Sequence, residues 1–133
     1  MARVPLADAS CQLLASVFSP IDWKEATRLL APGGGVLRLG PARDHLLELR
    51  QRLYDEVRDY VDDKHLADLP AELGLAHTET LSYRLSLDTY EARENLLAMT
   101  PHGWRVNPQR RERILAEPFE VTVAVRYDWL ARK

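Results

Sequence analysis

The chain has 133 residues, a length typical of one domain with a modest core, and 46% of them are hydrophobic. A formal net charge of −2 excludes a protein that binds nucleic acid over its whole surface, so such binding would need a local basic patch. The single cysteine, Cys11, excludes an intrachain disulfide and is typical of a reducing compartment.

The first predicted elements are a strand and a helix. A compact apolar run at residues 13–18 ends in β-branched and aromatic side chains before Pro20, which predicts a buried strand, although the periodicity alone also fits a helix. Asp22 is a favourable N-cap, with Glu25 as its capping-box partner. We therefore expect a helix over Trp23–Ala31.

A glycine-rich turn is expected next. Pro32 and the glycines at 33–35 predict the end of the helix and a tight turn into a short strand over residues 36–39. The order strand, helix, strand predicts a parallel pair with a right-handed crossover. These glycines follow a helix and precede a strand, so they lie on the wrong side for a phosphate-binding loop.

The middle of the chain is predicted to be mainly helical. Apolar residues near a 3.6-residue period indicate a helix of about four turns over residues 46–57, with Arg50 on its outer side. Residues 62–65 are expected in a solvent-exposed loop. An early proline and a late glycine predict a short helix at residues 70–75.

The last part of the chain combines two strands with two helices. Alternation over residues 77–87 predicts a half-buried strand. Helices are expected over residues 89–99 and 108–116, the second with Asn107 as N-cap. Residues 120–129 predict a final strand, which we expect to run antiparallel. The residues of the strand at 77–87 that share its apolar face are Leu81, Tyr83, Leu85 and Leu87.

The least generic stretch is Leu97–Arg105, which runs from the apolar end of the first of these helices toward the second. Trp104 and Arg105 could stack on a base or hold a phosphate, and a tryptophan packed under a loop and covered by the arginine is an equal alternative. His102 is a weaker candidate for a general base, because no acid or nucleophile lies near it in the sequence. Pro101 forces Thr100 away from helical geometry.

A second candidate site is a basic segment. Its arginines could contact RNA phosphates, although a solvated helix face is the commoner role for such residues. They are Arg105, Arg110, Arg111 and Arg113.

Several segments resemble the second half of a class I S-adenosylmethionine-dependent methyltransferase. Arg28–Val36 is similar to the R-x-L-x-P-G-G segment that precedes the fifth strand of that superfamily. Other segments are similar to the 23S rRNA (guanine-N1)-methyltransferase family, and the resemblance runs from about Leu6 to the C-terminus. The segments that carry it are Leu6–Ser10, Ser16–Pro20, Gly40-Pro41, His45-Leu46, Glu48-Leu49, Leu53–Val57 and Leu97–Arg105.

The resemblance implies an α/β fold with a partial Rossmann-like methyltransferase sheet. We expect about four strands in one partial domain over residues 1–133, the first two parallel and the last antiparallel, with a helical insertion at about 88–117. The implied cofactor is S-adenosylmethionine, with Ser16, Val17 and Phe18 as neighbours of its methionine end. The residues implied on the substrate side are Ser19, Pro20, Thr100, Pro101, His102, Trp104 and Arg105.

Departures from the family pattern limit what the resemblance implies. The chain has one cysteine where the family has a four-cysteine zinc module, so no metal site is expected. The acidic-Gly-x-Gly cofactor loop, the first three strands and the acid that binds the cofactor ribose have no counterpart. Their absence counts against cofactor binding by this chain alone.

Two functions remain open at this stage. One is a methyltransferase domain acting on guanine N1 of rRNA, or on a small-molecule analogue, with cofactor binding completed by a second polypeptide. The other is a non-catalytic interaction module derived from a methyltransferase. In both, the strand at residues 13–18 lacks its usual neighbour, so we expect a homodimer or a partner chain to bind this edge.

Metal and membrane sites are not indicated. His45, His65 and His77 lie too far apart for ligand spacing. No apolar run approaches the ~20 residues of a membrane span, and no signal-peptide pattern opens the sequence, so we expect a cytoplasmic protein.

Overall fold

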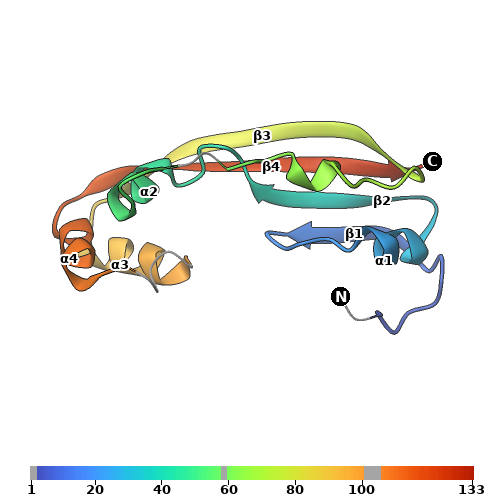
Figure 1. Cartoon of the computed structure of the whole chain (residues 1–133), viewed down its shortest axis with the longest axis horizontal. Helices are drawn as coiled ribbons and strands as arrows, with labels where there is room; N and C mark the ends of the chain where they lie inside the picture. Colours follow the sequence, from blue (N-terminus) through green and yellow to red (C-terminus); the bar gives the residue numbers. More distant parts are fainter. Residues whose placement is uncertain (1–2, 58–59, 101–105) are drawn as a thin grey trace. The chain divides into compact units, whose positions relative to one another are not determined.

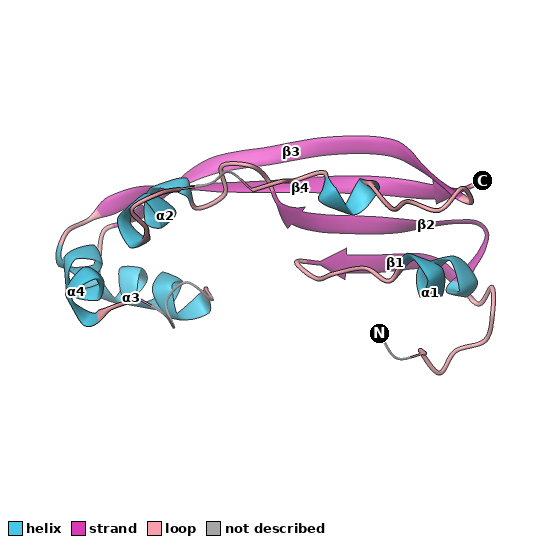
Figure 2. Ribbon diagram, in the orientation of Figure 1, coloured by secondary structure: helices cyan, strands magenta, loops and turns pink. Residues whose placement is uncertain are grey.

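The computed structural model describes residues 3–57, 60–100 and 106–133 (Figures 1 and 2). Within these ranges no helix is long and apolar enough to span a membrane. The elements are β1 (Cys11–Val17), α1 (Trp23–Leu29), β2 (Leu30–Pro41), α2 (Leu47–Leu53), a 3-10 helix η1 (Lys64–Leu66), β3 (Leu73–Leu87), α3 (Tyr90–Met99), α4 (Pro108–Ala116) and β4 (Phe119–Arg132).

The strands form one mixed sheet in the order β1-β2-β4-β3. Strand β1 is parallel to β2, and β4 is antiparallel to β2, with a register that runs from Gly35 opposite Ala131 to Pro41 opposite Val125. The predicted α/β class, the parallel first pair and the antiparallel last strand are confirmed. The two edges of the sheet are β1 and β3.

The chain divides into two compact units, each with its own core. The first contains residues 1–43, 61–81 and 125–133, and the second contains residues 44–60 and 82–124. The core of the first unit is formed by Ala26, Leu30, Val36, Leu73 and Leu130. The core of the second is formed by Leu46, Leu49, Leu53, Leu87, Leu97, Ile114 and Val121.

Strand β1 is an exposed edge, so the prediction of a buried strand there was wrong. Leu13 and Val17 are 57% and 58% exposed, and Leu14 is the β1 side chain that packs against the core of the first unit. Within residues 3–57, 60–100 and 106–133, no strand pairs with the outer side of β1.

The glycines lie inside β2, and the predicted turn at this position was wrong. Helix α1 ends at Leu29 and β2 begins at Leu30, so Gly33, with a φ of 79°, lies within the strand. A side chain at Gly35 would clash, because its Cβ would lie 2.6 Å from the ring of Trp129. Glycine is therefore required at this position by close packing between adjacent strands.

Helix α2 is shorter than predicted, since it ends at Leu53 and the backbone of Tyr54 is extended. Its last carbonyl group, that of Leu53, accepts a hydrogen bond from Arg110 Nη1 at 2.6 Å. Arg50 was expected to point outward but is buried, with its Nε donating to the His45 carbonyl at 3.0 Å and its guanidinium 4.1 Å from the centre of the Tyr60 ring.

Residues His45–Glu48 bond to β4 beyond the last residue that pairs with β2. The backbone N–H of Thr122 donates to Glu48 Oε1 at 2.8 Å, and that of Ala124 donates to His45 Nδ1 at 3.1 Å. The Leu46 N–H donates to the Thr122 carbonyl at 2.7 Å. Side chains from just before α2 and from its first turn, those of His45 and Glu48, therefore satisfy backbone groups of β4 that β2 does not reach.

Strand β3 replaces the helix predicted at residues 70–75, since it begins at Leu73. Its predicted apolar face is largely uncovered, with Leu81, Tyr83 and Leu85 exposed by 60%, 51% and 41%, and only Leu87 buried. The prediction of a half-buried strand was therefore wrong, because β3 is an edge strand whose alternating face lacks cover from described residues.

The two helices between β3 and β4 begin where the sequence places them. Thr89 Oγ1 accepts from the Ala92 N–H at 3.1 Å at the start of α3, and Asn107 Oδ1 accepts from the Arg110 N–H at 2.8 Å at the start of α4. Both N-caps follow the local rule that a short polar side chain satisfies a first-turn donor.

The effect of truncating a leucine on the free energy of unfolding should depend on whether that leucine lies in the core of the first unit. Leu30→Ala removes a fully buried side chain and should lower the free energy of unfolding by about 2–5 kcal/mol. Leu81→Ala truncates a leucine that is 60% exposed and should change it by less than about 0.5 kcal/mol. Urea denaturation measures both, and equal effects would contradict the burial pattern.

Candidate functional site

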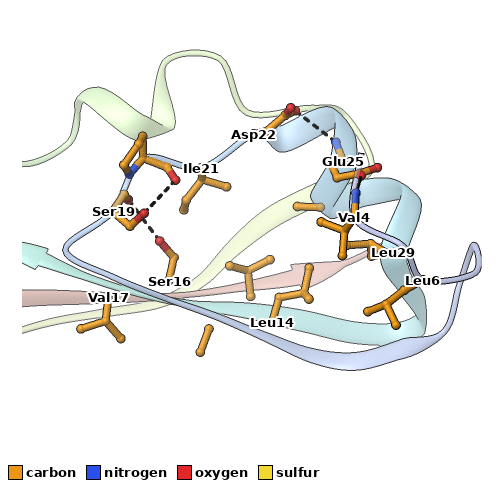
Figure 3. Close-up of a pocket in the computed structure, with 14 residues that line it drawn as sticks. Val4, Leu6, Leu14, Ser16, Val17, Ser19, Ile21, Asp22, Glu25 and Leu29 are labelled. Carbon is orange, nitrogen blue, oxygen red and sulfur yellow. Dashed lines mark hydrogen bonds between the residues drawn. The ribbon is translucent and has the colours of Figure 1, made fainter. Parts of the chain in front are cut away.

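A pocket lies where β1 ends and α1 begins, in the first unit (Figure 3). Its volume is about 330 Å³, within the size range of small-molecule sites. Four predicted site residues line it, namely Ser16, Val17, Ser19 and Pro20. The carboxyl end of a parallel strand is the position at which α/β sheets bind ligands.

The turn after β1 shapes one side of this pocket. Phe18 has a φ of 50°, which is uncommon for a bulky residue, and its N–H donates to the Leu39 carbonyl at 2.8 Å. Ser16 Oγ donates to the Ser19 carbonyl at 3.1 Å. Phe18 itself is 52% exposed and does not line the pocket, so the structure separates it from the other predicted cofactor neighbours.

Two carboxylates lie on the α1 side of the pocket. Asp22 caps α1 as predicted, accepting from the Glu25 N–H at 3.1 Å. Glu25 does not complete a capping box, because its carboxylate instead accepts from Arg28 and from the Val4 N–H. These bonds, the one from Arg28 above all, lower the pKa of Glu25 to about 2, so this carboxylate is ionised at neutral pH.

Arg28 holds the N-terminal segment, whose residues Val4 and Leu6 line the pocket. Its guanidinium donates to the carbonyl groups of Val4 and Leu6 at 2.9 and 2.8 Å, and to Asp8 Oδ1 at 2.8 Å. Within the described ranges, no lysine, arginine or histidine lines the pocket. Its apolar walls and carboxylates suit a ligand part that is apolar or cationic, and a ligand carboxylate would need donors from elsewhere.

The predicted substrate-side stretch is described only at its first residue. Thr100 is the C-cap of α3, in the second unit, and its buried hydroxyl donates to the Leu97 carbonyl at 3.1 Å. Pro101, His102, Trp104 and Arg105 lie outside the described residues. The roles predicted for all of these residues stay predictions.

The predicted basic residues have different surroundings. Arg110 donates a hydrogen bond to the Leu53 carbonyl and forms an ion pair with Asp55. Arg111 forms an ion pair with Glu94, with 3.5 Å between Nη2 and Oε2. Arg113 is exposed on α4. The predicted set therefore combines structural arginines with exposed ones.

Sequence reasoning missed a buried polar cluster around Asp128 in the first unit. Asp128 is fully buried on β4, with His65 Nε2 2.6 Å from Oδ2 and Arg126 Nε donating to Oδ1 at 3.1 Å. Arg38 lies opposite Asp128 on β2, and its Nη1 is 4.0 Å from Asp128 Oδ2. His65 lies in η1, not in the exposed loop predicted for residues 62–65. The sequence signal for this buried charge is a single acidic residue between two aromatic residues of the last strand, Tyr127 and Trp129.

Burial and hydrogen bonding act in opposite directions on these groups. Burial would raise the pKa of Asp128, but hydrogen bonds from Thr78, His65 and Arg126 outweigh it and hold that pKa below its usual value. Burial also lowers the pKa of His65, despite its hydrogen bond to Asp128. At neutral pH the cluster therefore combines an ionised Asp128 with a neutral His65.

The chain is similar to rRNA methyltransferases over nearly its whole length, although no protein-family model matches it. It is 38% identical over 128 residues to a protein from Micromonospora griseorubida with the provisional name 23S rRNA (guanine-N1)-methyltransferase. It is 33% identical, also over 128 residues, to the 23S rRNA (guanine(748)-N1)-methyltransferase of Streptomyces fradiae. These matches cover 93% of the chain but 43% and 45% of those relatives, so the chain spans less than half their length.

The fold is similar to that of a solved structure. A solved structure from Bacillus halodurans C-125, provisionally named a methyltransferase, superposes with a TM-score of 0.55 at 10% identity. The superposition covers 96% of the chain and 72% of that structure. The resemblance predicted from the sequence is confirmed by both comparisons.

The His65 environment predicts a loss of stability in mild acid. Because the pKa of His65 is lower in the folded protein than its usual 6.5, the unfolded chain takes up this proton first as the pH falls. The free energy of unfolding should therefore decrease as the pH falls below about 6.5, with a further contribution from His45, whose pKa burial also lowers.

Two variants isolate the His65 contribution. His65→Gln should flatten this pH dependence in urea denaturation, since it removes one of the two buried imidazoles. His77→Gln replaces an imidazole of the same unit that is 58% exposed, and should keep the wild-type dependence. A His65→Gln profile as steep as that of the wild type would contradict the assignment.

Proposed function

We propose that the chain forms part of an S-adenosylmethionine-dependent methyltransferase that modifies guanine N1 in 23S rRNA. The observation that carries this proposal is the identity of 33–38% to proteins named for that activity, over 93–98% of the chain. The methyltransferase fold supports it. Cofactor binding would be completed by polypeptide that these 133 residues do not contain.

The pocket beside β1 is the proposed position of part of the cofactor. Its apolar walls and its carboxylates, Asp22 and Glu25, suit the methionine side chain and its positive charge, next to Ser16 and Val17. Phe18 would contribute through the backbone of the turn, since its side chain lies outside the pocket. The residues present thus fit one part of the cofactor and leave its carboxylate and adenosine without partners.

Little covalent chemistry is required of the protein in this reaction. The bound cofactor supplies an already activated methyl group, so the protein must align guanine N1 with it and accept one proton. We assign Ser19 and Pro20, which line the pocket, to the guanine side, and we propose that the stretch Thr100–Arg105 of the second unit contacts the RNA substrate. A catalytic triad is not needed for such a transfer.

The outer edge of β1 is the proposed docking site for the missing polypeptide. Strand β1 bonds to β2 on one side, and its other side has no strand among the described residues. The relatives are more than twice as long as the chain, and we propose that the corresponding polypeptide pairs with this edge. An unpaired edge with exposed Leu13 and Val17 favours such pairing.

Cofactor binding tests the proposed function. The chain alone should show no saturable heat when titrated with S-adenosylmethionine at millimolar concentration, because the acidic-Gly-x-Gly loop is missing. Co-expression with the first half of the Streptomyces fradiae relative should give binding and methylation of 23S rRNA. N1-methylguanine blocks Watson–Crick pairing, so a reverse-transcription stop detects the product.

The controls separate an enzyme from an interaction module. The first half of the relative expressed by itself should leave the rRNA unmethylated. A stable complex that neither binds cofactor nor methylates rRNA would contradict the proposed activity and favour a non-catalytic module. Tight cofactor binding by the chain alone would contradict the need for a second polypeptide.

A charge on the β1 edge tests the docking site. Leu13→Lys should abolish the complex with the complementary polypeptide, because a lysine on an edge strand opposes pairing. Leu81→Lys places the same charge on β3, the other edge, at a leucine of similar exposure, and should leave the complex intact. Sedimentation velocity measures both.

The same experiment identifies the occupant of the edge. A wild-type chain that sediments as a dimer, and becomes a monomer with Leu13→Lys, would show that β1 binds a second copy of itself. Equal loss of the complex with both lysine variants would overturn the assignment of the interface to β1.

A further inference from the structure

A second pocket, of about 460 Å³, lies in the second unit and is separate from the one beside β1. It is formed by the last turn of α2, the residues after it and α4, which are the green and orange helices of Figure 1. The side chains that determine its chemistry are Arg52, Tyr54, Asp55, Arg110 and Arg113.

The charge of this pocket differs from that of the whole chain. Three guanidinium groups and one carboxylate line it, which leaves two positive charges in excess, whereas the chain has a net charge of −2. A local excess of this kind is the electrostatic feature that attracts a polyanion to an otherwise acidic protein.

The three arginines differ in how they are held. Arg110 is fixed by the Leu53 carbonyl and by Asp55. Arg52 donates to the Glu48 carbonyl at 2.9 Å, and its guanidinium lies 4.1 Å from the centre of the Phe119 ring. Arg113 forms no hydrogen bond or ion pair with the residues that the structure describes.

Two arginines of the pocket are therefore held in place by protein contacts, and the third is available to bind a ligand. Arg52 and Arg110 are positioned before any ligand binds, which reduces the entropy lost on binding. The guanidinium of Arg113 keeps all its donors for a ligand. A planar fork of donors matches the oxygens of a phosphate, and arginine is the residue best suited to this contact.

Tyr54 adds an aromatic surface to the cationic pocket. It follows the last residue of α2 in an extended conformation and is 42% exposed. An aromatic ring beside arginines is the combination by which proteins bind unpaired nucleotides, with the ring stacking on a base and the guanidinium groups contacting phosphates.

We propose that this pocket binds one nucleotide of single-stranded RNA, with a phosphodiester at Arg113 and Arg52 and the base against Tyr54. The choice of RNA over other polyanions rests on the proposed function. Single-stranded RNA is favoured over a duplex because stacking on a side chain needs a base that is not already stacked in a helix.

Replacing Arg113 tests the phosphate contact. The probe is a fluorescein-labelled RNA hairpin with an unpaired guanosine in its loop, and fluorescence anisotropy measures its binding to the whole chain. Arg113→Gln should weaken binding at least about fivefold and reduce the slope of log affinity against log salt by about 0.7, the value for one single-strand phosphate. Its matched control is Arg111→Gln, on the same helix but paired with Glu94 outside the pocket, and this variant should bind like the wild type.

Replacing Tyr54 tests the base contact. Tyr54→Ala should weaken binding about fivefold or more without changing the salt slope, whereas Tyr54→Phe should keep wild-type affinity because it keeps the ring. This result separates stacking from a purely electrostatic contact.

Three results would overturn the proposal. They are equal effects of Arg113→Gln and Arg111→Gln, competition by polyglutamate as strong as competition by unlabelled RNA, and no effect of Tyr54→Ala. These measurements use no cofactor and no second polypeptide. The pocket can therefore fail while rRNA methylation succeeds, or bind RNA while methylation fails.

Discussion

Among the residues that the structure describes, strand β1 has a hydrogen-bonded neighbour on one side only, and both the pocket and the exposed edge of the sheet depend on this strand. Its register with β2 fixes the turn at Phe18, and that turn places Ser16, Ser19 and Pro20 around the pocket beside α1. The same strand leaves backbone groups and two apolar side chains at the edge of the sheet. One element thus lines a pocket and forms an edge that is unpaired among the described residues.

Local sequence rules predicted the parts of the fold that depend on neighbours in the chain. The N-caps Asp22 and Asn107 and the two helices of the insertion follow from short-range hydrogen bonding. The parallel first pair follows from the handedness of a strand-helix-strand unit. The family resemblance added the sheet type, and its implied cofactor neighbours at Ser16–Phe18 stay a prediction.

Contacts between distant residues set the limit of sequence prediction. Apolar alternation at 81–87 predicted burial, but burial depends on an element that covers β3, and the alternation holds no information about it. The glycine at 35 was assigned to a turn because its contact, Trp129, lies far along the chain. Asp128 was missed because its partners come from three other segments, at His65, Thr78 and Arg38.

The residues behind the resemblance combine structural and binding roles. His45 and Glu48, two of the family-like positions, bond to the backbone of β4, so their identity follows from the need to satisfy buried donors. Ser16 and Ser19 instead face a pocket. A motif shared with an enzyme family therefore includes positions that maintain the sheet as well as positions that could contact ligands.

Hydrogen–deuterium exchange in β1 tests the central claim most directly. The claim is that the free edge of this strand pairs with a strand from the remaining part of a methyltransferase. In the chain alone, the amides of Cys11–Val17 that point away from β2 should exchange rapidly, and adding the complementary polypeptide should protect them while β3 is unchanged. Protection of these amides in the chain alone, or an active complex in which they stay unprotected, would contradict the account.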